Sequence, residues 1–438
     1  MAHTHSHDLG GPSLAGPRAR RAVIAALAVA ALATLVGLVL LWPGEVTTGG
    51  GPDGGSAAGF DAELLDATVT AIEPVPCTGV GDTSSVRCEL VRAELTEGPD
   101  RGAEATFELV VGGGAPELAR GDRIVVSYTA TAPPELAYQL ADFQRTTPLL
   151  VLAALFGVSV VALGRWRGLR ALIGVGVSLA VLGAFLLPAL LDGRDPLLTA
   201  LVGAAAIAFV SLFLAHGVNV RTAVALLGAL VALGITGALG AVFITATRLT
   251  GLADEDATLL RLAGGSVDAE GLLLAGIIIG AMGVLDDVTV TQVATTWELK
   301  RAAPGFGPLE LYRRAVRVGR DHIASTVNTL VLAYAGASLP LLLLFTQVER
   351  SVGDVITGEV VATEVVRTLV GSIGLIAAVP LTTALAALVL GGAPAPGPDG
   401  TVDEEVPAEL RRPRRRRRRR DPFWDDLPND EATGFLNQ

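Results

Sequence analysis

The stretch LLLAGIIIGAMGVLDDVTVTQV, residues 272–293, decides the fold class, because it has the length of a membrane span and carries two adjacent carboxylates. About 20 apolar residues in a helix cross about 30 Å of hydrocarbon. Similar runs recur along the 438 residues, of which 51% are hydrophobic and only 18% charged, with a mean hydropathy of +0.54. The sequence therefore predicts an α-helical polytopic membrane protein, not a soluble one.

We expect eight transmembrane helices. The first apolar run, 22–41, follows three arginines, and it is too long for a signal peptide and lacks an A-x-A cleavage site. We therefore interpret residues 18–42 as an uncleaved anchor. The other seven helices form a bundle over residues 147–390, at about 147–163, 169–191, 197–215, 223–247, 272–293, 323–345 and 365–390.

The charges of the connecting segments predict the orientation, because Lys and Arg in short loops stay on the cytoplasmic side. With the N-terminus inside, the cytoplasmic connectors hold most basic residues, among them Arg165, Arg221 and Lys300. The outer connectors hold most acidic residues, such as Asp192, Asp268 and Glu359. Both chain termini are then cytoplasmic.

Three segments lack hydrophobic periodicity. Residues 1–17 are expected to be a disordered cytoplasmic N-terminus, 43–59 a flexible linker, and 391–438 a disordered cytoplasmic tail. The tail has nine arginines between Arg411 and Arg420. Such a run can bind nucleic acid, but beneath a membrane it favours the anionic leaflet, so we expect a lipid partner and no nucleic acid.

Residues 60–135 have a different texture, with short β-branched segments at 64–72, 86–95, 104–111 and 123–128 separated by Gly and Pro. This pattern predicts a small extracytoplasmic β-rich domain with an OB-like barrel. Cys77 and Cys88 form a disulfide in an oxidising compartment, and two free thiols are the alternative. No metal site and no cofactor is predicted.

The candidate binding site centres on Asp287, because an ionisable group within a membrane is costly and needs a reason. Gly276, Gly280, Gly283, Asp287 and Thr291 share one helical face, on which the glycines predict close helix packing. Asp286 lies about 100° away. The expected partner is the next helix, where Asp321, Ser325 and Asn328 share a face. Alternatively, these polar groups only hold helices together.

Three segments resemble the YibE/F-like membrane proteins. They are 280–291 (GAMGVLDDVTVT), in which Asp287 matches the family's Asp, 319–336 (GRDHIASTVNTLVLAYAG) and 367–382 (RTLVGSIGLIAAVPLT). The resemblance spans about 60–390. Thr289, Gln292 and the additional Asp286 depart from the family pattern. The resemblance implies a multi-pass protein of the bacterial cell membrane, without implying an activity.

The sequence leaves three classes of function to consider. A secondary transporter, permease or channel-like protein for a small solute or ion is favoured by the buried Asp, and no Walker A pattern indicates ATP-driven transport. The alternative is an envelope binding or assembly protein. Its outer domain would recognise an envelope partner, or the protein would form a homo-oligomer. An enzyme is not expected, because neighbouring Asp286 and Asp287 diverge on a helix and no second catalytic motif is present.

Overall fold

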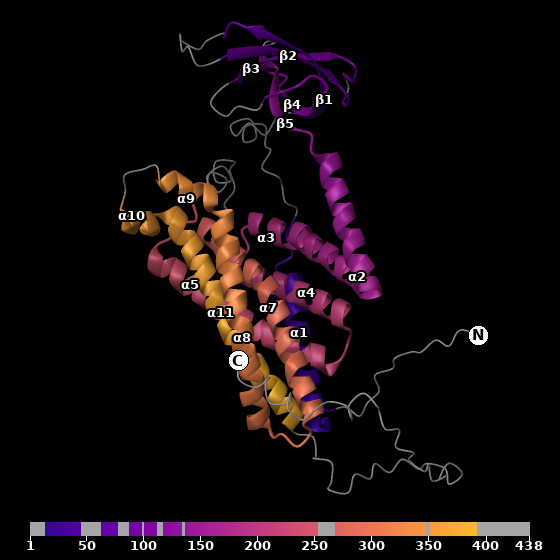
Figure 1. Ribbon diagram of the computed structural model, residues 1–438, viewed down its shortest axis with the longest axis vertical. Coiled ribbons are helices and arrows are strands. Elements are labelled where there is room, and N and C mark those ends of the chain that lie inside the picture. The colour runs from indigo at the N-terminus through magenta and orange to yellow at the C-terminus, as the bar shows by residue number, and fades with distance from the viewer. Residues whose placement is uncertain are drawn as a thin grey trace, which may run out of the picture. The chain divides into compact units, whose positions relative to one another are not determined.

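The computed structural model describes residues 14–44, 63–77, 87–98, 100–111, 117–133, 136–252, 268–346 and 351–391. Most of the expected disordered N-terminus, nearly all of the flexible linker and all but the first residue of the Arg-rich tail lie outside these residues. The described chain consists of a small β-sheet and a set of long helices (Figure 1).

The sheet has five antiparallel strands in the order β3-β2-β1-β4-β5. It curls into a half-barrel around a core that includes Leu65, Val69, Val91, Phe107 and Val126. Alternate residues of β2 and β3 are buried, which is the period-2 pattern expected of a sheet with one covered face. The bounds are β1 (Glu63–Val75), β2 (Arg87–Leu95), β3 (Glu104–Val111), β4 (Arg123–Tyr128) and β5 (Tyr138–Phe143).

The fifth strand lies beyond the domain end expected at residue 135. β5 pairs with β4 from Tyr138 opposite Tyr128 to Phe143 opposite Ile124. The two tyrosine rings stack at 5.0 Å between centroids, which adds a cross-strand aromatic contact at this edge. The β-rich unit therefore extends to Phe143, and two residues separate it from the first long helix of the bundle, which begins at Thr146.

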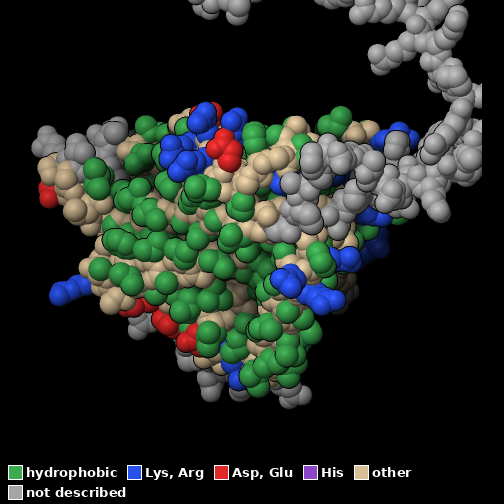
Figure 2. All heavy atoms as spheres, turned by 90° about the horizontal axis from the view of Figure 1, so that it is seen from below, with side chains coloured by type: hydrophobic (Ala, Val, Ile, Leu, Met, Phe, Trp, Pro, Cys, Tyr) green, Lys and Arg blue, Asp and Glu red, His purple; other side chains and the backbone are tan. Residues whose placement is uncertain are grey.

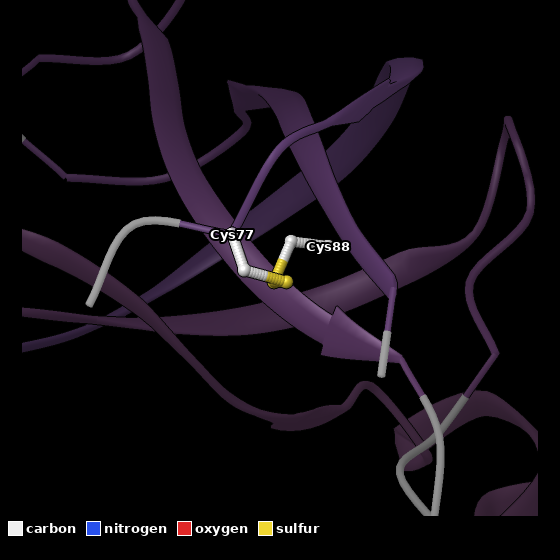
Figure 3. The surroundings of a disulfide bond; sticks show 2 residues. All are labelled: Cys77 and Cys88. Atoms are coloured by element: carbon white, nitrogen blue, oxygen red, sulfur yellow. A yellow bond between two sulfur atoms is a disulfide. The ribbon is translucent and has the colours of Figure 1, made fainter. Parts of the chain in front are cut away.

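The disulfide between Cys77 and Cys88 is confirmed (Figure 3). Cys88 lies on β2 opposite Val75 of β1, and Cys77 follows two residues after Val75. Their Cα atoms are 5.1 Å apart, within the usual range for a disulfide. The bond therefore links the end of β1 to the start of β2. The two cysteines and Glu108 also cluster, but the disulfide occupies both thiols.

The helices follow the apolar runs of the sequence. The chain forms α1 (Pro17–Leu40), α2 (Thr146–Val181), the π-helical turn η3 (Leu182–Leu186), α3 (Leu187–Leu191), α4 (Pro196–His216), α5 (Val220–Thr247), α7 (Ala269–Ala302), α8 (Pro308–Ala337), α9 (Leu339–Thr346), α10 (Val352–Thr357) and α11 (Glu359–Gly391).

Six helices in the described chain are long and apolar enough to cross a membrane: α1, the continuous segment Thr146–Leu191, α4, α5, α7 and α11. Thr146–Leu191 was expected as two helices, and a kink at Arg165 (φ 51°, ψ −129°) divides it. Figure 1 shows the chain turning sharply within α2. α8 is not among the six, because its first half is polar and charged.

Helices α5, α7 and α11 form the centre of the bundle and pack tightly through small residues. A Cβ atom at Gly228 of α5 would lie 2.4 Å from Oγ1 of Thr382, and one at Gly374 of α11 would lie 2.0 Å from Oγ1 of Thr236. Both positions therefore require glycine. This is the close approach that small residues permit between membrane helices.

The outside of the bundle is strongly apolar. Val39 of α1 is 75% exposed, Leu163 of α2 is 92% exposed and Leu388 of α11 is 68% exposed. Figure 2 shows an end-on face on which hydrophobic side chains cover a broad area and Lys and Arg side chains gather in groups. Apolar surface of this extent is typical of helices that are surrounded by lipid.

Contacts at the helix ends fall into two sets. In the first set, the Glu359 carboxylate accepts from the backbone N and from Oγ1 of Thr250, both at 2.6 Å, and so joins the end of α5 to the start of α11. In the second set, one apolar cluster joins the starts of α1, α5 and α8 to the ends of α7 and α11, through Val23, Val224, Leu311, Trp297 and Leu390. The helices therefore run antiparallel between two common ends.

Candidate functional site

Helix α7 carries the candidate residues and has one buried side and one open side. The buried side includes Ile278, Leu285, Val288 and Gln292, all at most 1% exposed, and it faces α5 and α11. The glycines and Asp287 lie on the opposite side. The large aliphatic side chains bury more apolar area than glycines can, so they determine which side of α7 faces the centre.

The glycine face of α7 does not make the close helix contact that its spacing predicts. A Cβ atom at Gly276 or Gly283 would meet no described atom within 4 Å, and one at Gly280 would meet only the hydroxyl of Tyr334, at 3.2 Å. Asp287 is exposed on this face, and Thr291 is half-buried. The carboxylate of Asp287 lies within electrostatic reach of His216 at the end of α4.

The polar face of α8 is likewise turned outward. Asp321, Ser325 and Asn328 are all exposed, and among the described residues no hydrogen bond joins them to α7. Instead, Ile323 and Val327 of α8 pack against an apolar cluster of α7 and α11 that is made of Val284, Val288, Leu375 and Val379. Apolar packing thus orients α8, and the two predicted polar faces do not meet.

Asp286, one residue earlier, points into the bundle. It borders a small cavity between α4, α5 and α7, which is lined by Ala208, Ala229, Leu230, Leu233, Met282, Leu285 and Asp286. Oδ2 of Asp286 accepts a long hydrogen bond of 3.4 Å from Oγ of Ser211. Oδ1 is buried and has no hydrogen-bond partner among the described residues. The inward carboxylate of the pair is therefore Asp286.

A second buried polar group lies where α7, α8 and α11 cross. Gln292 is fully buried, and its Oε1 accepts a 3.1 Å hydrogen bond from Oγ1 of Thr383. Its Nε2 is buried without a partner in the described chain. The amide lies against Gly319 of α8, where a Cβ atom would be 2.7 Å from Nε2 and 2.6 Å from Cγ1 of Val379. Gly319 therefore lets α8 approach α7 and α11.

Ser211, Gln292 and Thr383 were not among the site residues predicted from the sequence. Ser211 is a single polar residue in an apolar run, whereas Gln292 and Thr383 each follow a threonine, and both patterns also occur in ordinary helix packing. For Gln292 a signal was present, because it lies six residues after Asp286 and continues the side of α7 that carries Leu285 and Val288. Ser211 could not be paired with Asp286, since the sequence does not determine how α4 and α7 contact each other.

Together, the apolar surface and the six helices of membrane-spanning length indicate a multi-helix membrane-embedded protein. A family model described as YibE/F-like protein matches residues 152–392, more than half of the chain. The chain therefore belongs to the YibE/F-like family. The matched region begins after the sheet, so it is shorter than the 60–390 expected. No curated protein and no solved structure matches the chain.

Proposed function

We propose that the chain crosses the bacterial cell membrane eight times. Thr146–Leu191 has 46 residues, which at 1.5 Å each is about 69 Å, more than twice the thickness of the hydrocarbon core. Its two halves, divided at Arg165, each supply one crossing. The apolar second half of α8, together with α9, supplies another. With α1, α4, α5, α7 and α11 the number is eight.

The two sets of helix ends support cytoplasmic termini. The set that includes the start of α1 and the end of α11 also includes the end of α7, whose last turn carries Lys300 and Arg301. At the other set lie the acidic residues Asp192, Asp268 and Glu359. By the positive-inside rule the first set is cytoplasmic, and the sheet is then extracytoplasmic. Reporter enzymes fused after residues 166 and 305 test this proposal, because both reporters should be located in the cytoplasm.

The sheet corresponds best to a partly open OB-like barrel. The strand order β3-β2-β1-β4-β5 with contacts between β3 and β5 supports this interpretation, because it brings the two edge strands toward closure. Its long first strand has a bulge between Val69 and Ala71, which bends β1 and increases its twist.

The function that the bundle supports best is secondary transport or channel-like passage of a small solute or ion. The observation that carries this proposal is the Asp286 carboxylate, which borders a small cavity between three helices and has a buried oxygen without a hydrogen-bond partner in the described part of the chain. An ionisable group is costly inside a membrane, so it is retained where it binds something. Three helices contribute to this cavity, and such interhelical sites are where transporters bind their substrates.

Proteoliposomes test this proposal. A flux of protons or of a small solute should be present with the wild-type protein and lost in Asp286→Asn. Asp287→Asn is the matched control, because it removes the neighbouring charge on the exposed face of the same helix and should retain the flux. If all three proteins are folded and inserted and show equal flux, Asp286 does not bind the transported species and serves only in helix packing.

The alternative is an envelope binding or assembly protein, and the separately folded, disulfide-linked sheet favours it. Five strands with their own apolar core form a unit that could recognise a partner. A stoichiometric complex between an envelope protein and full-length protein, lost when the sheet residues 63–143 are deleted, would support this function. Persistence of solute flux after the same deletion would favour transport.

A further inference from the structure

The surroundings of Asp286 determine what kind of ligand this carboxylate can bind. The cavity that it borders is otherwise formed by alanine, leucine and methionine side chains. Ser211 is the one hydroxyl that donates to it among the described residues. The site therefore offers one carboxylate and one hydroxyl in an apolar wall.

This donor set is too small for a metal cation. Calcium takes six to eight oxygen ligands, and magnesium takes a near-octahedral set in which it keeps several waters, for which a cavity of about 10 Å³ has no room. A soft metal would need several thiolate, thioether or imidazole ligands, and the cavity has one thioether, that of Met282. The cavity has a volume of about 10 Å³, which is room for about one water-sized ligand.

Among the described residues, no neighbouring positive charge serves as a counter-ion for Asp286 either. The cavity-lining residues of α5, Ala229, Leu230 and Leu233, carry no charge, and Asp287 on α7 adds a like charge. The nearest titratable group described on α4 is His216, more than one helical turn beyond Ser211 and exposed. Arg221 at the start of α5 and Arg167 beside the kink of α2 lie near His216.

Ser211 can support both protonation states of Asp286. Its hydroxyl has two acceptors within reach, Oδ2 of Asp286 at 3.4 Å and the backbone carbonyl of Ala208 at 3.5 Å. When the carboxylate is ionised, the hydroxyl donates to Oδ2. When the carboxyl is protonated, its O–H donates to Oγ of Ser211, whose own proton turns to the Ala208 carbonyl. The exchange requires rotation of one hydroxyl and no backbone movement.

We infer that the ligand of Asp286 is a proton, which Ser211 helps to accept and release from the cavity between α4, α5 and α7. The step is COO⁻ + H⁺ → COOH, with no other bond formed or broken. This inference rests on the proposed transport function and specifies the ion that it uses. Metal-ion coupling at this residue is the competing outcome.

Infrared difference spectroscopy of the full-length protein in lipid nanodiscs tests this inference. The spectrum between acidic and alkaline buffer should contain a carboxylic C=O band that is lost in Asp286→Asn and retained in Asp287→Asn. In Ser211→Ala the band should persist at a higher frequency, because the carboxyl loses its hydrogen-bond acceptor. Addition of Na⁺, K⁺ or Ca²⁺ should leave the pH dependence of this C=O band unchanged.

A titration that shifts with one of these cations, or a wild-type spectrum in Asp286→Asn, would overturn the inference. The infrared spectrum and the flux in proteoliposomes are independent measurements, so they test the proton site and the transport function separately. A cation-dependent titration together with a flux that needs Asp286 would reject the proton and leave transport intact. A cation-independent band without any flux would reject transport and leave the proton site intact.

Discussion

Replacing Gly319 by alanine should destabilise the bundle, because its Cβ atom would enter the contact between α8 and Gln292. The added carbon would lie 2.6 Å from Cγ1 of Val379, and 2.7 Å and 2.8 Å from Nε2 and Oε1 of Gln292. Ordinary contact begins near 3.4 Å, so these neighbours must retreat by several tenths of an ångström. Overpacking of this kind costs about 1–3 kcal/mol.

The control is Gly283→Ala on α7, because a Cβ atom there meets no described atom within 4 Å. Both substitutions gain about 1 kcal/mol of helix propensity at an interior helical position. The difference between the two variants therefore isolates the steric cost at Gly319, about 1–3 kcal/mol. Unfolding in mixed detergent–SDS micelles, followed by the fluorescence of buried Trp297, would measure it.

The variant Gln292→Ala tests directly whether the steric cost at Gly319 arises from its contact with Gln292. Combined with Gly319→Ala, it should recover part of the loss, giving a coupling free energy of at least about 0.5 kcal/mol between the two positions. If Gly319→Ala were as stable as Gly283→Ala, the contact among α7, α8 and α11 described above would be wrong.

Three further variants probe other parts of the chain. Cys88→Ala should lower the unfolding free energy of the sheet by about 3 kcal/mol, because the lost bond closes a short loop, and denaturant titration of the sheet's near-UV circular dichroism would detect it. Gly374→Ala should destabilise the bundle in the same micelle assay, with partial recovery on adding Thr236→Ala, since the new Cβ would lie 2.0 Å from that Oγ1; no recovery would contradict the contact. Lys300→Met should cost about 1–3 kcal/mol, because it leaves two loop carbonyls without their buried donor, and an unchanged unfolding midpoint would refute this role.

The positions of the long helices could be predicted from the sequence because each is a nearly continuous apolar run. α5 was expected at 223–247 and is Val220–Thr247. The disulfide followed from two cysteines in one small domain. The strand at Tyr138–Phe143 was missed, since it lies after the expected domain end at residue 135 and close before a long apolar run.

The orientation of the acidic pair was harder to predict. Asp286 and Asp287 are adjacent, so a rotation of α7 by about 100° exchanges the residue that faces inward. The glycine spacing favoured Asp287, whereas the burial of Ile278 and Leu285 turned that face outward. The decisive quantity, the apolar area that each face buries, depends on neighbours that a single sequence does not specify.

Lys300 has a practical consequence for experiments on this protein. It is the only lysine of the chain, its side chain is 7% exposed, and its ammonium donates at 2.9 Å to the carbonyls of Pro304 and Phe306. Amine-reactive acylating reagents should therefore leave Lys300 unmodified in the folded protein. A lysine introduced into a connecting loop would therefore be the one accessible lysine side chain, so fluorophores or crosslinkers could be attached to it without replacing Lys300.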